Sequence, residues 1–177
     1  EKRNQIVDLS AFIKAEPANW ASTNFAPRMM SLSQVDGKQY GLAFNASSPI
    51  MYFNTDLVKR AGGDPKNMPN TWDGLISLAG KIKSLSGDVS GISYDVHAWP
   101  DDWLFQGMIY QLGGKLVEPG TKKVGFNNDT GLQALKTMRR FVTDGGMQLV
   151  DWDQSRQQFG AGKTGILFST PAHLKIV

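Results

Sequence analysis

Aromatic and acidic side chains gather in one short stretch of the sequence, YDVHAWPDDWLFQ at residues 94–106. A flat indole can cover the apolar face of a sugar ring, and carboxylates can accept hydrogen bonds from the sugar hydroxyls. Those hydroxyls need partners, because a buried polar group without one costs about 1–3 kcal/mol. The stretch therefore suits sugar recognition, and its candidate contacts are Asp101, Trp103, Trp99, Asp102 and His97.

Two carboxylates side by side could instead belong to a glycoside hydrolase. Hydrolysis of a glycosidic bond needs two carboxyl groups set across that bond, about 5 to 9 Å apart. Asp101 and Asp102 are consecutive, and consecutive residues on a helix do not face each other. An enzyme that uses Asp101 or Asp102 as its acid is therefore the alternative, and we expect a binding protein with no catalytic residue. A third alternative, a helical interaction or structural domain, would have no aromatic cleft.

Other common site chemistries find little support in the sequence. The absence of cysteine excludes disulfides, thiolate metal sites and a cysteine nucleophile. The two histidines, His97 and His173, have no ligand partner at helical spacing, so we expect no metal and no cofactor, and place both on the surface or in a cleft. GAGKTG at residues 160–165 resembles the end of a phosphate-binding loop, but it would open a strand where such a loop opens a helix.

Charge and hydropathy narrow the class of protein further. The net charge is +3, but the basic residues are scattered and form no stripe interleaved with aromatics, so we expect no nucleic-acid partner. No segment approaches the roughly 20 apolar residues of a membrane-spanning helix. The first residues, EKRNQIVDL, lack the apolar core of a signal peptide. We expect a soluble, secreted protein whose leader has been removed, which agrees with a cysteine-free chain in an oxidising compartment.

Alternating strand and helix patterns must position these residues. Thr71 is suited to cap a helix in which apolar residues recur at three- and four-residue spacing up to Leu85. In the helix expected at 127–146, we expect a buried face made of Leu132, Leu135, Met138 and Val142. The other expected helices are short pieces within 1–35, then 100–114, 153–161 and a last one that starts at 171. The expected strands follow Asp36-Gly37 and run through 40–44, 50–54, 90–96 and 164–169.

This order of elements predicts an α/β fold. The chain opens on helices with no preceding strand to cover and closes within an element. We therefore expect a fragment of a larger protein rather than a self-contained domain.

The segment YGLAFNASSPIMYFNTDLVKRAGGDPKNMPNTWDGLISLAGKI, which begins at Tyr40, carries a recognisable combination of motifs. Its Tyr52-Phe53-Asn54-x-Asp56 and Thr71-Trp72-Asp73 motifs resemble those of family 1 extracellular solute-binding proteins of ABC importers. That family includes maltodextrin-binding and glycerol-phosphate-binding proteins. The later FGAGKTGILFSTPAHL is similar to the family's Gly-Lys strand entry, and the resemblance spans about residues 36 to 174.

The resemblance implies a partial periplasmic-binding-protein type II-like fold, made of the second lobe and a remnant of the first. Residues 1–48 would be the C-terminal part of lobe 1 with its return strand, residues 49–177 an incomplete lobe 2, and the crossover would lie near 45–54. It also implies a monomer that captures a sugar or polyol in a cleft between lobes and delivers it to an ABC transporter membrane permease. With half of the cleft, we expect the 177-residue piece to bind sugars no tighter than about millimolar, roughly −4 kcal/mol.

The resemblance also places residues of the opening stretch at the cleft, with Asp101 and Trp103 at positions that often contact sugar. The alternative is that Asp101 and Asp102 only complement a helix dipole while Trp103 packs in the core. Where sugar-binding members often carry an aromatic after the Gly-Lys strand, this chain has Ser169-Thr170-Pro171-Ala172-His173, and Ala43 stands where proline is common. Further contact candidates are Ser47, Ser48, Tyr52 and Trp152, whereas Trp72 and Trp20 are expected to be structural.

Acidic residues at the start of one helix favour a neutral ligand. Asp95, Asp101 and Asp102 would repel a phosphate that a bare helix N-terminus would attract. We therefore expect a neutral sugar, oligosaccharide or polyol rather than glycerol phosphate.

Overall fold

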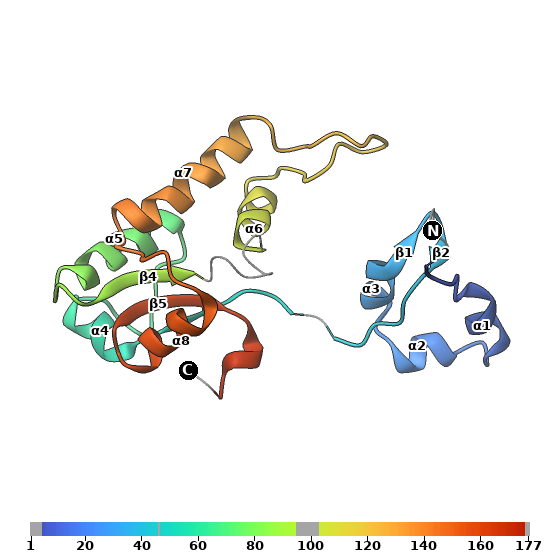
Figure 1. Cartoon of the computed structure of the whole chain (residues 1–177), viewed down its shortest axis with the longest axis horizontal. Helices are drawn as coiled ribbons and strands as arrows, with labels where there is room; N and C mark the ends of the chain where they lie inside the picture. Colours follow the sequence, from blue (N-terminus) through green and yellow to red (C-terminus); the bar gives the residue numbers. More distant parts are fainter. Residues whose placement is uncertain (1–4, 46, 95–102, 176–177) are drawn as a thin grey trace. The chain divides into compact units, whose positions relative to one another are not determined.

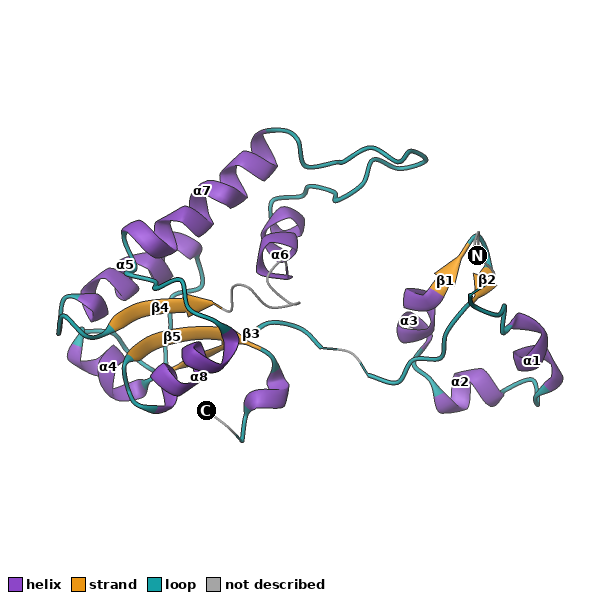
Figure 2. Cartoon of the chain, in the orientation of Figure 1, coloured by secondary structure: helices purple, strands orange, loops and turns teal. Residues whose placement is uncertain are grey.

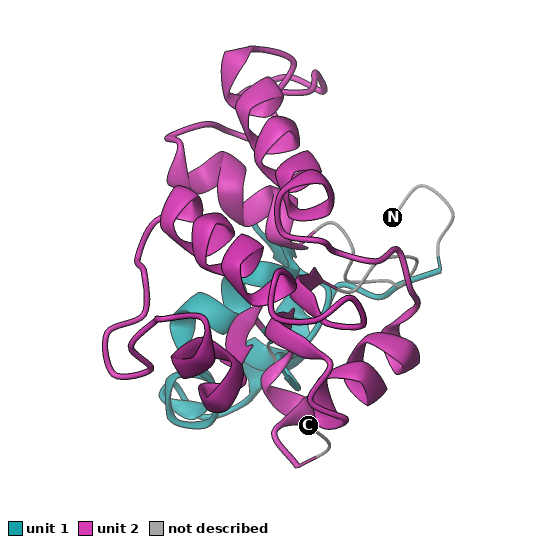
Figure 3. Ribbon diagram, turned by 90° about the vertical axis from the view of Figure 1, so that its left-hand side faces the viewer, with its two compact units in different colours: residues 1–47 teal, residues 48–177 magenta. Residues whose placement is uncertain are grey.

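The computed structural model describes residues 5–45, 47–94 and 103–175. Backbone contacts divide the chain into two compact units, residues 1–47 and 48–177, which Figure 3 shows in different colours. The assignment of these units to two lobes of a larger fold stays a prediction. Among the described residues, no helix has the length and apolar character needed to cross a membrane.

Short helices and a small hairpin make up the first unit (Figure 1). Asp36 and Gly37 form the turn of the hairpin with positive φ of 50° and 75°, a conformation that glycine and aspartate adopt more readily than other residues. The turn predicted there is therefore confirmed. The elements of this unit are α1 (Ser10–Ala15), α2 (Trp20–Asn24), α3 (Pro27–Met30), the 3-10 helix η1 (Ser31–Ser33), β1 (Gln34–Val35) and β2 (Lys38–Gln39).

Gln39 holds this unit together from a buried position. Its side-chain amide donates to the carbonyls of Met30 and Gly41, at 3.0 and 2.6 Å. Its backbone carbonyl accepts from the amide of Leu9 at 2.7 Å. Gln39 thus joins β2 to α3 through its side chain and to the residue before α1 through its backbone carbonyl, in a unit where apolar core residues are few.

The strand expected to follow Asp36-Gly37 is present only as β2, and its expected continuation through residues 40–44 is wrong. The described backbone there is extended but unpaired, with Leu42 and Phe44 exposed, Phe44 by 98%. An apolar run becomes a strand only when a neighbouring strand accepts its backbone hydrogen bonds and covers its side chains. Among the described residues, no named strand pairs with this segment.

Three strands form the sheet of the second unit in the order β3-β5-β4 (Figure 2). β5 pairs in parallel with β4 and antiparallel with β3. Every residue of β4 and β5 is buried, which indicates that both faces of the sheet are covered. The strands are β3 (Ile50–Phe53), β4 (Ser90–Tyr94) and β5 (Thr164–Ser169).

Helices connect these strands and confirm the α/β class, and a 3-10 turn follows the last strand. α5 packs along β4, while α4 and α8 contact β5. Side-chain caps define their starts: Asn54 caps α4, Thr71 caps α5, Asn128 caps α7 and Asp151 caps α8. The elements are α4 (Thr55–Arg60), α5 (Trp72–Lys83), α6 (Trp103–Gln111), α7 (Asp129–Thr143), α8 (Trp152–Gly160) and η2 (Pro171–His173).

Close packing between α5 and β4 depends on the absence of a side chain at Gly91. A Cβ atom built there would lie 1.9 Å from the carbonyl oxygen of Ala79 and 2.7 Å from that of Gly145. The backbone of α5 therefore approaches the strand more closely than any residue larger than glycine would permit.

The buried face predicted for α7 is wrong. Leu132, Leu135 and Val142 are 50%, 56% and 41% exposed, and only Met138 of the predicted set is half-buried. Instead, the helix buries Gly131, Ala134 and Phe141. The apolar leucines suggested one face, but the small residues on the neighbouring face allow α7 to approach the core closely enough to bury Phe141.

The end of the described chain also differs from expectation. Residues 171–173 form the short 3-10 turn η2, whereas the sequence predicts the start of a longer helix there. Thr170 caps this turn, and its hydroxyl accepts a hydrogen bond from the amide of Ala172 at 3.3 Å. The turn brings His173 back against the end of β5.

Candidate functional site

The carboxyl ends of β4 and β5 lie at one edge of the sheet together with the amino end of β3. This follows from the register, in which Tyr94 pairs with Phe168 in parallel and Ile50 pairs with Ser169 antiparallel. In open α/β sheets, ligands bind in the crevice outside the carboxyl ends of the strands. We name this region the carboxyl edge and define it by Ile50, Tyr94 and Ser169.

Trp152 lies at the carboxyl edge because α8 runs back along β5. The helix leads directly into β5 through a tight turn at Gly162, where φ is 71°, so the beginning of the helix faces the far end of the strand. Asp151 caps that beginning, and its carboxylate accepts from the amide of Gln154 at 2.8 Å. The indole of Trp152 is half-buried there.

His173 holds the polar tip of this indole. The Nε1–H group of Trp152 donates to Nε2 of His173 at 3.0 Å, and the two rings meet edge to face with centroids 4.9 Å apart. The Nδ1 atom of His173 is 2.8 Å from the hydroxyl of Ser169. The sequence predicts a surface or cleft position for His173, and because it is only 6% exposed the surface position is wrong.

Tyr52 reaches the same corner from β3. Its hydroxyl donates to the carbonyl of Thr170 at 2.9 Å, and its ring packs edge to face on Phe159 of α8 with centroids 6.2 Å apart. Burial raises the pKa of the Tyr52 phenol above its ordinary value of 10.0, because the charged phenolate would be poorly solvated. The phenol thus remains a hydrogen-bond donor at neutral pH.

The charged groups beside Trp152 come from the first turns of α8. The guanidinium of Arg156 lies 5.7 Å from the centroid of the indole ring and forms an ion pair with Asp153. Asp151 adds a second carboxylate. This part of the edge therefore carries two negative charges and one positive charge, a balance that does not favour a phosphate group.

The remaining predicted site residues divide between described and undescribed positions. Trp103 is the first residue of α6 as described and is half-buried, so it is not sealed in the core. Ser48 is exposed just before β3, and Ser47 is the exposed last residue of the first unit. Outside the described residues lie Asp101, Asp102, Trp99, His97 and Asp95.

Trp72 packs as a structural residue, as expected. Its ring centroid lies 5.4 Å from that of Phe168 and 5.7 Å from that of Phe141. Its Nε1–H group donates to the side-chain carbonyl of Gln111 at 2.8 Å, which joins α5 to α6. In the first unit, Trp20 contacts Phe25 with centroids 5.5 Å apart.

Sequence reasoning missed Ser169, Thr170 and His173 as members of the site. The segment that contains them was noted only because it lacks an aromatic residue. A signal was present, since a Ser-Thr-Pro sequence after a buried strand predicts a turn, and a turn there returns the following side chains to the strand end.

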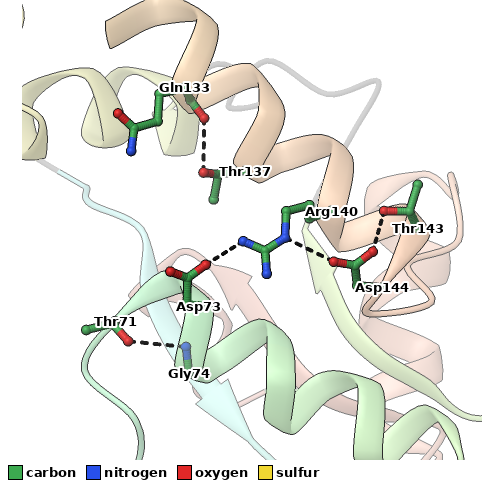
Figure 4. Close-up of polar contacts among 8 residues, drawn as sticks. All are labelled: Thr71, Asp73, Gly74, Gln133, Thr137, Arg140, Thr143 and Asp144. Carbon is green, nitrogen blue, oxygen red and sulfur yellow. Dashed lines mark hydrogen bonds and ion pairs between the residues drawn. The ribbon is translucent and has the colours of Figure 1, made fainter.

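A separate polar cluster connects α5 to α7 (Figure 4). The guanidinium of Arg140 lies between two carboxylates: it pairs with Asp73 in the first turn of α5 and with Asp144 at 3.0 Å. A hollow of about 520 Å³ between α5, α6 and α7 includes Arg140 and Asp73 in its wall. Because its arginine is already paired with carboxylates, this cluster serves to join the helices.

Metal ligation finds no support in the described part of the chain, where no three histidine, cysteine or acidic side chains form a group able to hold an ion. The carboxyl edge instead offers two aromatic rings, Tyr52 and Trp152, held at their polar tips by hydrogen bonds. Such an arrangement can bind the apolar face and the hydroxyl groups of a small molecule.

Comparison with known proteins yields one family. The model of a family described as bacterial extracellular solute-binding protein matches residues 1–176. A relative in Brucella abortus (strain 2308), which is named as a binding protein, is 31% identical over 152 residues, or 83% of this chain and 36% of its own length. The sn-glycerol-3-phosphate-binding periplasmic protein of Escherichia coli O1:K1 / APEC is 43% identical over 56 residues, covering 32% of this chain and 13% of that protein.

A solved structure of a solute-binding protein has a similar fold. An ABC transporter solute-binding protein from Thermotoga lettingae TMO, solved with bound α-D-tagatose, superposes with a TM-score of 0.79 at 20% identity. The match covers 96% of this chain and 44% of that structure. The fold is therefore a partial periplasmic-binding-protein type II-like fold, and the chain spans about a third of the length of the first curated relatives that it matches.

Proposed function

The chain belongs to the family of bacterial extracellular solute-binding proteins, and we propose from this premise that it supplies one wall of a cleft that captures a neutral sugar or polyol outside the cytoplasm. Delivery to the membrane permease of an ABC importer is the corresponding role for the whole receptor, acting as a monomer without nucleic acid. The tagatose complex of the Thermotoga lettingae protein supports the sugar, and the family description supports the extracytoplasmic location.

One observation carries the proposal: Trp152 is held at the carboxyl edge by a hydrogen bond from its indole to His173. A half-buried ring fixed in this way can cover the apolar face of a sugar without losing rotamer freedom when the sugar binds. Tyr52 lies on β3 and the exposed Ser48 lies just before that strand, and Trp103 begins α6 after β4. Asp101, Asp102 and Trp99 remain candidates from the sequence, and Ser47 is a candidate from the first unit.

Charge supports a neutral ligand over glycerol phosphate. Two carboxylates and one paired arginine surround Trp152, and the sequence adds Asp95, Asp101 and Asp102 near the start of α6. These negatively charged carboxylates would repel a negatively charged phosphate group. The Escherichia coli relative binds sn-glycerol 3-phosphate according to its name, so that ligand is the informative competitor in a binding test.

A calorimetric panel of neutral mono- and oligosaccharides with sn-glycerol 3-phosphate tests this proposal. We expect the neutral sugars to bind the 177-residue chain no tighter than about millimolar, and Trp152→Ala to remove the heat signal. Tyr110→Ala, which alters an exposed aromatic of α6, is the matched control and should leave binding unchanged. The proposal would be contradicted if sn-glycerol 3-phosphate bound and the neutral sugars did not, or if Trp152→Ala left sugar binding unchanged.

The hydrolase alternative has its own test. Incubation with chromogenic glycosides should give no product, because the family and fold are those of binding proteins associated with transport. Turnover that Asp101→Asn abolishes would establish an enzyme instead.

A further inference from the structure

We propose that His173, as the neutral tautomer with its proton on Nδ1, is a positioning residue that fixes the Trp152 indole at the carboxyl edge, and that uptake of a second proton releases the indole. The importance of Trp152 for ligand binding rests on the proposed function. The positioning itself can be tested without any ligand.

The partners of the imidazole determine its tautomer. An indole Nε1–H group can only donate, so Nε2 of His173, 3.0 Å away, must present its lone pair. In a neutral imidazole the proton is then on Nδ1, which donates to the hydroxyl oxygen of Ser169 at 2.8 Å. The three side chains therefore form a directed series of hydrogen bonds from Trp152 to His173 and from His173 to Ser169.

Protonation of His173 is incompatible with this series. The imidazolium carries N–H groups on both nitrogens, so Nε2–H would point at the Nε1–H group of the indole and the hydrogen bond would be lost. His173 is only 6% exposed, so water solvates a charged imidazolium poorly in this position. The expected response is that the imidazole or the indole turns away and reaches water.

The charged groups that the structure describes near His173 do not change the conclusion that protonation breaks its hydrogen bond with the indole. α8 contributes Asp151, Asp153 and Arg156, of which Arg156 pairs with Asp153 and lies over the indole. β3 contributes Tyr52, whose pKa is raised by burial, and β5 contributes no titratable side chain. Lys175 lies beyond η2 in an exposed position.

Nitrogen NMR of the chain with His97→Gln tests the tautomer. That variant leaves His173 as the only histidine, and its long-range nitrogen–proton spectrum should show Nδ1 protonated and Nε2 bare near neutral pH. Acid titration should shift the ring resonances of His173 and the indole N–H resonance of Trp152 with the same midpoint pH. The indole resonance is assigned by its absence from the spectrum of Trp152→Phe. A proton on Nε2 of His173 near neutral pH, or an indole resonance that does not shift when the ring titrates, would overturn the proposal.

Two substitutions at His173 separate positioning from general structural damage. Glutamine offers a carbonyl acceptor that does not titrate, so His173→Gln should keep the indole N–H shift near its wild-type position at all pH values. Leucine offers no acceptor, so His173→Leu should give an indole resonance near that of an exposed tryptophan, at neutral as at acid pH. If His173→Gln retained the wild-type pH dependence, or His173→Leu left the indole unchanged, His173 would have no positioning role. Because none of these measurements contains a sugar, their failure is distinguishable from failure of the proposed function.

Discussion

The hydroxyl of Tyr52 donates a 2.9 Å hydrogen bond to the carbonyl of Thr170, a residue 118 positions later in the chain. The contact joins the edge strand β3 to the turn that follows the central strand β5. It therefore fixes the position of the segment that carries His173 relative to the strand that enters from the first unit.

Replacement of this phenol by Tyr52→Phe should cost about 1 kcal/mol of unfolding free energy, because the buried Thr170 carbonyl loses the phenol donor and keeps the backbone amide of His173 at 3.1 Å. The pKa of Tyr52 is raised above 10.0 by burial. The unfolded chain thus releases this proton first, so the stabilisation is complete below pH 10.0 and is lost as pH rises through the higher folded value. Urea unfolding at several pH values should show the difference between wild type and variant shrinking above that point. A constant difference at alkaline pH would contradict the assignment.

Gly91→Ala should destabilise the second unit severely. The new methyl group would lie 1.9 Å from the carbonyl oxygen of Ala79 and force α5 away from β4. We expect a loss of more than about 4 kcal/mol, the exceptional end of the range for single substitutions. Gly107→Ala is the matched control, because a methyl group there meets no atom within 4 Å and lies inside α6. The control should stabilise the protein by about 0.5–1 kcal/mol. If thermal unfolding gave the same change in stability for both variants, the packing argument would be refuted.

Thr164→Val should stabilise the protein. The hydroxyl oxygen of Thr164 is buried, and among the described residues no hydrogen-bond partner accompanies it. Valine has nearly the same shape and removes the unsatisfied group, so we expect a gain of about 1 kcal/mol in chemical denaturation. Thr130→Val, which alters a threonine near the start of α7, should give no comparable gain. Loss of stability in Thr164→Val would show that the hydroxyl has a partner, for example a bound water.

Asp144→Asn should flatten the dependence of stability on acid pH. Hydrogen bonds from the Thr143 hydroxyl and then from Arg140 hold the pKa of Asp144 below its ordinary value of 3.8. The unfolded carboxylate therefore takes up its proton first as pH falls, so the stabilisation present above pH 3.8 is lost towards the lower folded value. Denaturation followed below that pH should show a smaller slope in the variant. Equal slopes for Asp144→Asn and the wild type would contradict this assignment.

Most elements of the second unit were predictable because their signals are local. The helix that Thr71 caps and the strand at 164–169 have a capping residue or a compact apolar run, and both are found where expected. The buried face of α7 was not predictable in this way. Leu132 and Leu135 have the strongest hydropathy signal, but the face is decided by whether Gly131 and Ala134 allow a neighbour to approach, which is a tertiary property.

The sequence indicated the kinds of side chain in the candidate site better than it indicated which residues form the site. Tyr52 and Trp152 were both named from the sequence, and the structure brings them to one corner through Phe159 and the end of β5. His173 was set aside because it has no metal-ligand partner at helical spacing, and no motif predicts its contact with Trp152, 21 residues away. Contacts of this kind depend on the pairing of strands and cannot be read from spacing.

The entry of the chain into β3 gives a way to observe the site. Ser48 lies two residues before Ile50, which pairs with Ser169, the residue that contacts His173. The chain contains no cysteine, so Ser48→Cys would create a single attachment point for a fluorescent dye. A reporter there would sit where the polypeptide leaves one unit and joins the other, and its emission would register occupancy of the carboxyl edge in real time.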